Sequence, residues 1–378
     1  MPKLTFSALI TLMGLISFVP YSSAASPQPT VQLKTEPPIE KIVPSGQPVK
    51  FTLQALDAQG KRLKDAKISL SILTPRKTHW LTTDFPIVEG TQLLELAEIA
   101  PTGELEVQQV LPIRGKYQLL VNVTPLKGQE FVPTQQTFTI SVPESQDKYR
   151  NFVILAVILL LLGLAGGWVI GAKEKTQVGE IAPPKVRLLL SGATLVAIAT
   201  LLTVNISAEL AESHHHQHSS QQGEAAASTA PALQVRWLGD VHATVGQLAE
   251  MGVQLNDPNT GQMAKDAVIK VRAIGLEHNE TVFAYQGVPD STGKLTWKQQ
   301  FFDGAPHKIE VEVAPQANAS RQFQPFTRSQ DVEVDGIAPP LYIRLISLGY
   351  FTGILVLGLL LGLFLKRSRL VPTPKVGF

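Results

Sequence analysis

The chain has 378 residues, 44% of them hydrophobic, and a mean hydropathy of +0.11, so apolar runs must be added to otherwise soluble modules. Its 33 basic and 31 acidic residues are spread thinly, which excludes a basic patch for nucleic acid. It contains no cysteine, which excludes disulfides, thiolate metal sites and a cysteine nucleophile, and favours a bacterial envelope over a eukaryotic exported protein.

The first 25 residues have the pattern of a secretory signal peptide. Lys3 supplies the positive charge, Leu4 to Val19 the apolar stretch, and Ser23, Ala24 and Ala25 a small-residue cleavage site. We predict a signal peptide over 1–25 with cleavage after Ala25. An uncleaved anchor helix is the alternative, and it leaves the following residues on the same side of the membrane.

Residues 26–146 are predicted to form an exported antiparallel β-sandwich. Apolar and polar residues alternate between turns rich in Gly, Pro and Asp, as they do in half-buried strands. The apolar sets are Val49, Phe51, Leu53 and Ala55; Ile68, Leu70 and Ile72; Tyr117, Leu119, Val121 and Val123; and Phe138, Ile140 and Val142. Several short strands at this spacing indicate an immunoglobulin-like sandwich.

Three later runs, 152–172, 188–208 and 345–365, are long enough to cross about 30 Å of hydrocarbon and contain no charged residue. Lysine and arginine gather between the first two runs, in 173–187, and after the third, in 366–378. Cytoplasmic segments carry this excess of positive charge, so we predict that both lie in the cytoplasm. The signal peptide independently requires the same orientation.

Small residues recur at four-residue spacing in the first and third runs, and this spacing lets helix backbones approach closely. They are Gly163, Gly167 and Gly171, then Gly349 with Gly353 and Gly358 with Gly362. Either the spacing marks a specific helix contact, or it reflects how common glycine is in membrane helices. None of the runs has the buried ionisable groups that mark most ion pathways, which argues against a transporter.

A second sandwich is predicted over 232–336, because this segment repeats the order of the first. Gly46-Gln47 recurs as Gly246-Gln247, Lys64-Asp65-Ala66 as Lys265-Asp266-Ala267, and Thr102-Gly103 as Thr292-Gly293. Leu119, Val121 and Val123 recur as Ile309, Val311 and Val313, and each copy is followed by an apolar run. We interpret the chain as all-β exported domains with α-helical membrane anchors, the two sandwiches being related by duplication.

Gly46, Asp65-Ala66 and the run Gly115-Lys116-Tyr117-Gln118-Leu119-Leu120-Val121 resemble bacterial immunoglobulin-like sandwiches, including YtkA-like and FixH-like envelope modules. The resemblance covers each exported domain and not the helices. Some members of these families are associated with copper handling. The first domain departs from a copper site, because it has only His79 and no Met.

The linker 209–231 begins with a histidine tract: His214, His215, His216 and His218. Four imidazoles within five residues can bind copper, nickel or zinc. One alternative is a solvated spacer that happens to be rich in histidine, because a linker offers no neighbouring groups to orient the rings, and a pH-responsive hinge is another. Titration of these ions into a fragment from Glu209 to Gly336 separates metal binding from both alternatives, since only a binding tract loses affinity when the four histidines become alanine.

No catalytic motif accompanies these features. The second domain adds His242, His278 and His307, and His307 falls where the first domain has Tyr117, which favours a structural role. Paired acids such as Glu104 with Glu106 are expected on outward strand faces. The sequence therefore predicts a non-enzymatic protein of the bacterial cytoplasmic membrane that binds or positions another envelope protein. An accessory role in copper, nickel or zinc homeostasis is the alternative.

Overall fold

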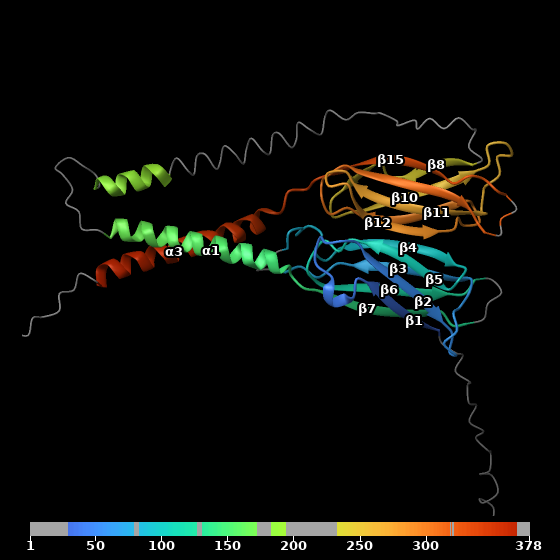
Figure 1. Cartoon of the computed structure of the whole chain (residues 1–378), viewed down its shortest axis with the longest axis horizontal. Coiled ribbons are helices and arrows are strands. Elements are labelled where there is room, and N and C mark those ends of the chain that lie inside the picture. The colour runs from blue at the N-terminus through green and yellow to red at the C-terminus, as the bar shows by residue number, and fades with distance from the viewer. Residues whose placement is uncertain are drawn as a thin grey trace, which may run out of the picture.

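The computed structural model describes residues 29–78, 83–126, 131–171, 183–193, 233–317, 319 and 321–368. The expected signal peptide 1–25, the linker 209–231 and the tail from residue 369 lie outside these ranges. The described residues form two β-sandwiches side by side and a pair of long helices that leave both sandwiches at the same end (Figure 1).

Domain 1 (Thr30–Val142) has seven strands in two sheets. They are β1 (Thr30–Glu36), β2 (Val49–Leu56), β3 (Ala66–Leu73), β4 (Gln92–Ala100), β5 (Glu104–Gln109), β6 (Gly115–Thr124) and β7 (Thr134–Val142), with a 3-10 turn at Ile39–Lys41. The order is β1-β2-β5 in one sheet and β7-β6-β3-β4 in the other. The alternation predicted from the sequence is confirmed: Val49, Phe51, Leu53 and Ala55 are all buried.

Domain 2 (Gln234–Asp335) has the same strand order. Its strands are β8 (Gln234–Gly239), β9 (His242–Thr244), β10 (Leu248–Asn256), β11 (Ala267–Gly275), β12 (Glu280–Gly287), β13 (Lys294–Gln300), β14 (His307–Pro315) and β15 (Phe326–Asp335). The three-stranded side is β8-β10-β13, and the other side is β12-β11-β14-β15, extended by the short parallel strand β9. The fold is an immunoglobulin-like sandwich in each domain.

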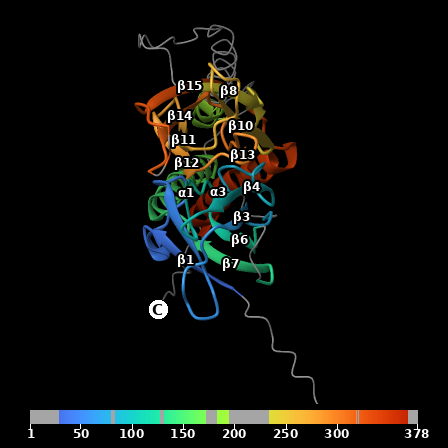
Figure 2. The same ribbon diagram turned by 90° about the vertical axis from the view of Figure 1, so that its right-hand side faces the viewer.

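The two domains are joined through their sheets. β5 pairs with β12 and β4 pairs with β13, both antiparallel, so one eight-stranded and one seven-stranded sheet run through both domains. Figure 2 shows the strands as two continuous columns, from β1 and β7 at one end to β15 and β8 at the other. Each of the four edge strands at this junction is therefore paired with a strand of the other domain over three residues.

The junction is reciprocal. Leu96 in β4 pairs with Leu70, and Tyr285 in β12 pairs with Val271, so Leu96 and Tyr285 occupy equivalent positions. Leu96 pairs across the junction with Trp297, whereas Tyr285 pairs with Val107, which is the equivalent of Trp297. Each surface thus contacts its own counterpart, as in the interface of a symmetric dimer.

Two helices are long and apolar enough to span a membrane: α1 (Gln146–Ile170) and α3 (Leu341–Ser368). Only 17% and 11% of their apolar windows are buried, which is unlike the core helix of a soluble protein. Two of the three predicted spans, 152–172 and 345–365, thus correspond to such helices, and the third stays a prediction. Of the expected span 188–208 only 188–193 fall inside them, as part of a helix over 184–193.

α1 and α3 are parallel and cross at their glycines. A Cβ on Gly163 would meet the backbone of Leu355 and Leu359, and one on Gly358 would meet that of Leu160 and Leu164. Gly167 and Gly362 repeat the same relation one turn further on. These glycines therefore mark a specific contact between the two helices, as the sequence allowed. A Cβ on Gly349 or on Gly353 would meet nothing within 4 Å among the described residues, so this pair marks no contact there.

We predict that Gly163→Ile separates the two helices, because any side chain there strikes the backbone of α3. Since the chain has no cysteine, Phe152→Cys and Phe351→Cys can report the contact; their rings lie 6.3 Å apart between centroids. Disulfide formation between them should fall severalfold in Gly163→Ile. Gly166→Ile is the matched control, because a Cβ on Gly166 would meet nothing within 4 Å outside its own helix. Equal yields in both variants would contradict the contact.

Candidate functional site

The predicted metal tract, His214, His215, His216 and His218, lies outside the described residues, so copper, nickel or zinc binding there stays a prediction. Within the part of the chain that is described, no three His, Asp or Glu side chains gather in a way that could hold a metal ion. His242 is exposed beside Glu333, with 3.4 Å between Nδ1 and the carboxylate oxygen. His278 is exposed in the turn between β11 and β12.

The acids that the sequence placed on outward strand faces form exposed ion pairs. Glu106 pairs with Lys50 at 2.9 Å and Glu104 with Arg62 at 2.9 Å. In domain 2, Arg272 and Glu310 are 2.8 Å apart. These carboxylates are solvated and paired, and none of them lies in a cleft.

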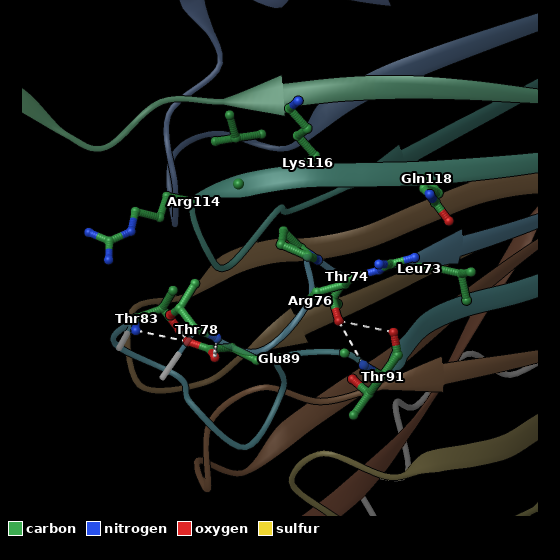
Figure 3. Close-up of a pocket in the computed structure, with 14 residues that line it drawn as sticks. Leu73, Thr74, Arg76, Thr78, Thr83, Glu89, Thr91, Arg114, Lys116 and Gln118 are labelled. Carbon is green, nitrogen blue, oxygen red and sulfur yellow. Dashed lines mark hydrogen bonds between the residues drawn. The ribbon is translucent and has the colours of Figure 1, made fainter. Parts of the chain in front are cut away.

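A cavity of about 720 Å³ opens in domain 1, at the end from which α1 leaves (Figure 3). It lies between the outer face of β6 and β3 and the long connection from β3 to β4, residues 74–91, which we call the β3–β4 loop. Cationic, acidic, amide, threonine and apolar side chains line it. Among them are Arg76, Arg114, Lys116, Glu89, Leu73 and Gln118.

Threonines at the two ends of the β3–β4 loop hold it in place. The Thr74 hydroxyl donates to the carbonyl oxygen of Val88 at 2.7 Å, and the backbone N–H of Thr91 donates to the Thr74 hydroxyl at 2.9 Å. The backbone N–H of Gly90 donates to the Pro75 carbonyl at 2.7 Å. The loop is thus closed at its base by hydrogen bonds, and its described residues, among them Arg76, Thr78 and Thr83, line one wall of the cavity.

Glu89 orders the outer part of this loop. Its side chain is buried, with 3% of the residue exposed, and accepts hydrogen bonds from the backbone N–H of Thr78 (3.0 Å) and of Thr83 (2.9 Å). The Thr83 hydroxyl donates to the same carboxylate at 2.8 Å. A carboxylate that already accepts three hydrogen bonds is arranged to hold backbone, not to take a proton from a substrate.

Positive charge surrounds the cavity. Arg114 is 2.7 Å from Glu144 between Nη1 and the carboxylate oxygen, so its charge is largely matched. Arg76 and Lys116 are exposed and form no ion pair with any residue that the structure describes. Figure 3 places Arg76 toward Gln118, Arg114 at the opposite end, and Lys116 above, beside the next strand. The cavity therefore has a net positive lining.

The β3–β4 loop also contacts the other parts of the molecule. Asp84 is 2.6 Å from Lys148 in the first turn of α1. Phe85 packs edge-on against Phe302 of domain 2, with ring centroids 5.3 Å apart. The side-chain amide of Gln300 in β13 donates to the Thr91 hydroxyl at 2.9 Å. One loop thus connects domain 1, domain 2 and α1.

Domain 2 has no equivalent loop. The connection at the same place, between β11 and β12, is the short turn Leu276–Asn279. Sequence reasoning did not identify the cavity, because no motif marks it. The available signal was the unequal length of this one connection in two otherwise similar segments.

Two buried polar groups near the starts of β6 and β14 have structural roles. The Tyr117 hydroxyl donates to the Ile113 carbonyl at 2.8 Å and accepts from the Ile113 N–H at 2.9 Å, and burial raises the pKa of Tyr117. His307 occupies the equivalent position, 1% exposed, with Nδ1 2.7 Å from the Ala305 carbonyl oxygen. Burial lowers the pKa of His307, so it is held neutral in the core.

Glu98 is an acid buried at the junction of the domains. Glu98 is 6% exposed, and its carboxylate accepts a hydrogen bond at 2.7 Å from the backbone N–H of Val288 in domain 2. Burial raises the pKa of Glu98 to about 7, although this bond and one from Ile99 oppose the shift. The junction therefore favours the protonated carboxyl.

No protein-family model and no curated protein matches the chain. Among solved structures it is similar to the Yersinia pseudotuberculosis adhesin InvE, with 12% identity over 80% of this chain and 58% of that chain and a TM-score of 0.21. It is also similar to invasin, a bacterial integrin-binding protein, with 9% identity over 82% of this chain and 40% of that chain and a TM-score of 0.20.

A CARDB domain from Pyrococcus furiosus, solved with di-metal ions, is similar over 31% of this chain and 99% of that domain, with 16% identity and a TM-score of 0.21. Two of these three neighbours are thus a bacterial adhesin and an invasin. None of the three is a YtkA-like or FixH-like module. At such TM-scores the similarities carry no argument about function.

We predict that Glu98 makes the junction less stable as pH rises. Its folded pKa of about 7 exceeds the usual 4.5, so the folded state binds more protons between these values. The contribution of Glu98 to stability is then full below pH 4.5 and is lost as the pH rises to 7, a loss of about 3 kcal/mol. Glu98→Gln should remove this loss, which chemical denaturation at pH 5 and pH 8 measures.

Glu95→Gln is the matched control, because Glu95 lies on the same strand with its side chain exposed. It should leave the pH dependence of unfolding unchanged. A Glu98→Gln chain that loses stability between pH 5 and pH 8 as steeply as the original would show that another group causes the dependence.

Proposed function

We propose that this protein is a non-enzymatic scaffold of the bacterial cytoplasmic membrane, which holds a rigid pair of immunoglobulin-like domains outside the cytoplasm to bind another envelope component. The observation that carries the proposal is the parallel pair α1 and α3, which continues directly from the last strand of each domain. Only three residues separate β7 from α1, so the domains sit next to whatever surrounds the helices.

Exposed apolar side chains on the helices support a lipid environment. Leu161, Leu162, Leu348 and Phe364 are each between 58% and 68% exposed. Such a patch is rare on the surface of a soluble monomer. Further exposed apolar residues gather where the helices leave the sandwiches: Ile39, Val43, Val241, Leu276 and Ile337. They suit an end of the domains that rests near the membrane surface.

The geometry also supports a third crossing. Because α1 and α3 run in the same direction and both domains lie at their N-terminal ends, the chain must return across the membrane between Gly171 and Leu233. The apolar run 188–208 is the segment with the length and composition to do so. With this crossing, 173–187 and 366–378 would lie in the cytoplasm, as their lysines and arginines predict.

We further propose that the two halves arose by duplication of a sandwich-plus-helix unit that once formed a symmetric dimer. Identical strand order, the reciprocal junction and the reciprocal glycine contacts support this origin. In a fused dimer with parallel helices, the chain needs one extra membrane crossing to bring the second domain to the same side as the first. The run 188–208 would supply this crossing.

Single cysteines test the topology, since the chain has none of its own. In spheroplasts, a membrane-impermeant maleimide should label Lys67→Cys in domain 1 and Lys270→Cys in domain 2. Lys175→Cys and Lys375→Cys should react only after the membrane is permeabilised. Labelling of either of the last two in intact spheroplasts would overturn the arrangement with three crossings.

Crosslinking in intact membranes tests the binding role. A photo-reactive residue in place of Lys77, in the β3–β4 loop, should capture one envelope protein in stoichiometric amount. The same residue in place of Lys265, in the distal turn of domain 2, is the control and should capture much less. A chain recovered alone, or only with copies of itself, from every position would rule out a scaffold that acts through a partner.

A further inference from the structure

The β3–β4 loop is the main departure from symmetry in the molecule. Apart from the short strand β9, the strands, the junction and the helix pair of one half have counterparts in the other, and each is explained by packing or backbone hydrogen bonding. The long connection from Thr74 to Thr91 has only the turn Leu276–Asn279 opposite it. It encloses a cavity and is stabilised by the buried Glu89. Because this ordered loop is present in one half only, it is a candidate for a ligand-binding site.

The cavity has the size and composition of a small-molecule site. Its volume of about 720 Å³ falls within the range of ligand pockets, roughly 300–1,000 Å³. Leu73, Pro75 and Val142 give it an apolar portion, and Gln118 gives it an amide. Arg76 and Lys116 supply cationic donors that no described acid neutralises, and Arg114 adds a third positive charge beside Glu144.

We propose that this cavity binds a small organic molecule that carries a phosphate group, with Arg76 and Lys116 as the residues that neutralise the phosphate. Arginine and lysine are the side chains that recognise phosphate, arginine through its planar fork and lysine as a point charge. Both are exposed, so either can turn toward a ligand without breaking a buried contact. Glu89 holds the wall through three hydrogen bonds and keeps one negative charge in the lining, which the three cations Arg76, Lys116 and Arg114 outnumber.

The phosphate can come from a soluble molecule or from a phospholipid headgroup. The cavity lies at the end of domain 1 that continues into α1, and Val142 lines it four residues before that helix begins. A phospholipid headgroup carries the same phosphate group as a soluble phosphate ester. At the membrane surface it would lie a short distance from the cavity. Only the phospholipid headgroup rests on the proposed function, because it requires the domains to lie beside a membrane. Binding of a soluble phosphate does not require this.

The test uses the full chain and two probes. Glycerol 3-phosphate is titrated by calorimetry into the chain in a non-ionic detergent. Separately, hydrogen exchange of the β3–β4 loop is followed in nanodiscs of phosphatidylcholine with and without phosphatidylglycerol. The variant is Arg76→Gln with Lys116→Gln. The matched control is Lys308→Gln, on β14, the strand of domain 2 that corresponds to β6.

We expect at least one probe to bind or to slow exchange in the loop, and the double variant to weaken this by about tenfold or more. Lys308→Gln should change nothing. An effect of glycerol 3-phosphate alone assigns the site to a soluble molecule, and an effect of phosphatidylglycerol alone assigns it to a headgroup; either supports the proposal. Unchanged thermal unfolding of the double variant, measured alongside, shows that its fold is intact.

The proposal is overturned if neither probe has an effect, if the double variant responds as the original chain does, or if Lys308→Gln loses the response equally. Such a failure leaves cysteine labelling and partner capture untouched. The phosphate site and the membrane scaffold therefore stand or fall separately.

Discussion

The backbone pairing of β4 with β13 and of β5 with β12 is the constraint on which the rest of the structure depends. A sandwich with three and four strands leaves two edges on the side where β4 and β5 lie, and unpaired edges invite association with other chains. Here each domain covers the edges of the other. Two domains that could have moved independently on a linker become one body with two continuous sheets.

This constraint also fixes the helices. Because the pairing is reciprocal, the last strands β7 and β15 end on the same side of the body, and α1 and α3 must leave in the same direction. Their glycines then meet in the same reciprocal way, Gly163 against α3 and Gly358 against α1. The strand contacts and the helix contacts favour the same arrangement of the two halves. Each set of contacts therefore stabilises the arrangement that the other set needs.

Sequence reasoning recovered what periodicity encodes. Alternation placed β2, β3, β6 and β7, and glycine spacing indicated the contact between helices, because both depend on residues that are close in the chain. The junction could not be predicted, since Leu96 and Trp297 carry no local sign of their pairing. The cavity was missed for a similar reason: Glu89, Thr78 and Thr83 are brought together by a loop whose path depends on the fold around it. The histidine tract was conspicuous in the sequence, yet nothing in the described structure bears on it.

The position of the β3–β4 loop connects the candidate site to the architecture. Its base is closed by Thr74 and Thr91, its middle carries Glu89, and its outer part reaches Lys148 on α1 and Phe302 in domain 2. In a symmetric scaffold, most contacts have a counterpart that would resist a change on one side only. The loop has no counterpart in domain 2, so its contacts with α1 and with domain 2 occur once in the molecule. A ligand in the proposed site would therefore lie next to a loop that touches domain 1, domain 2 and α1.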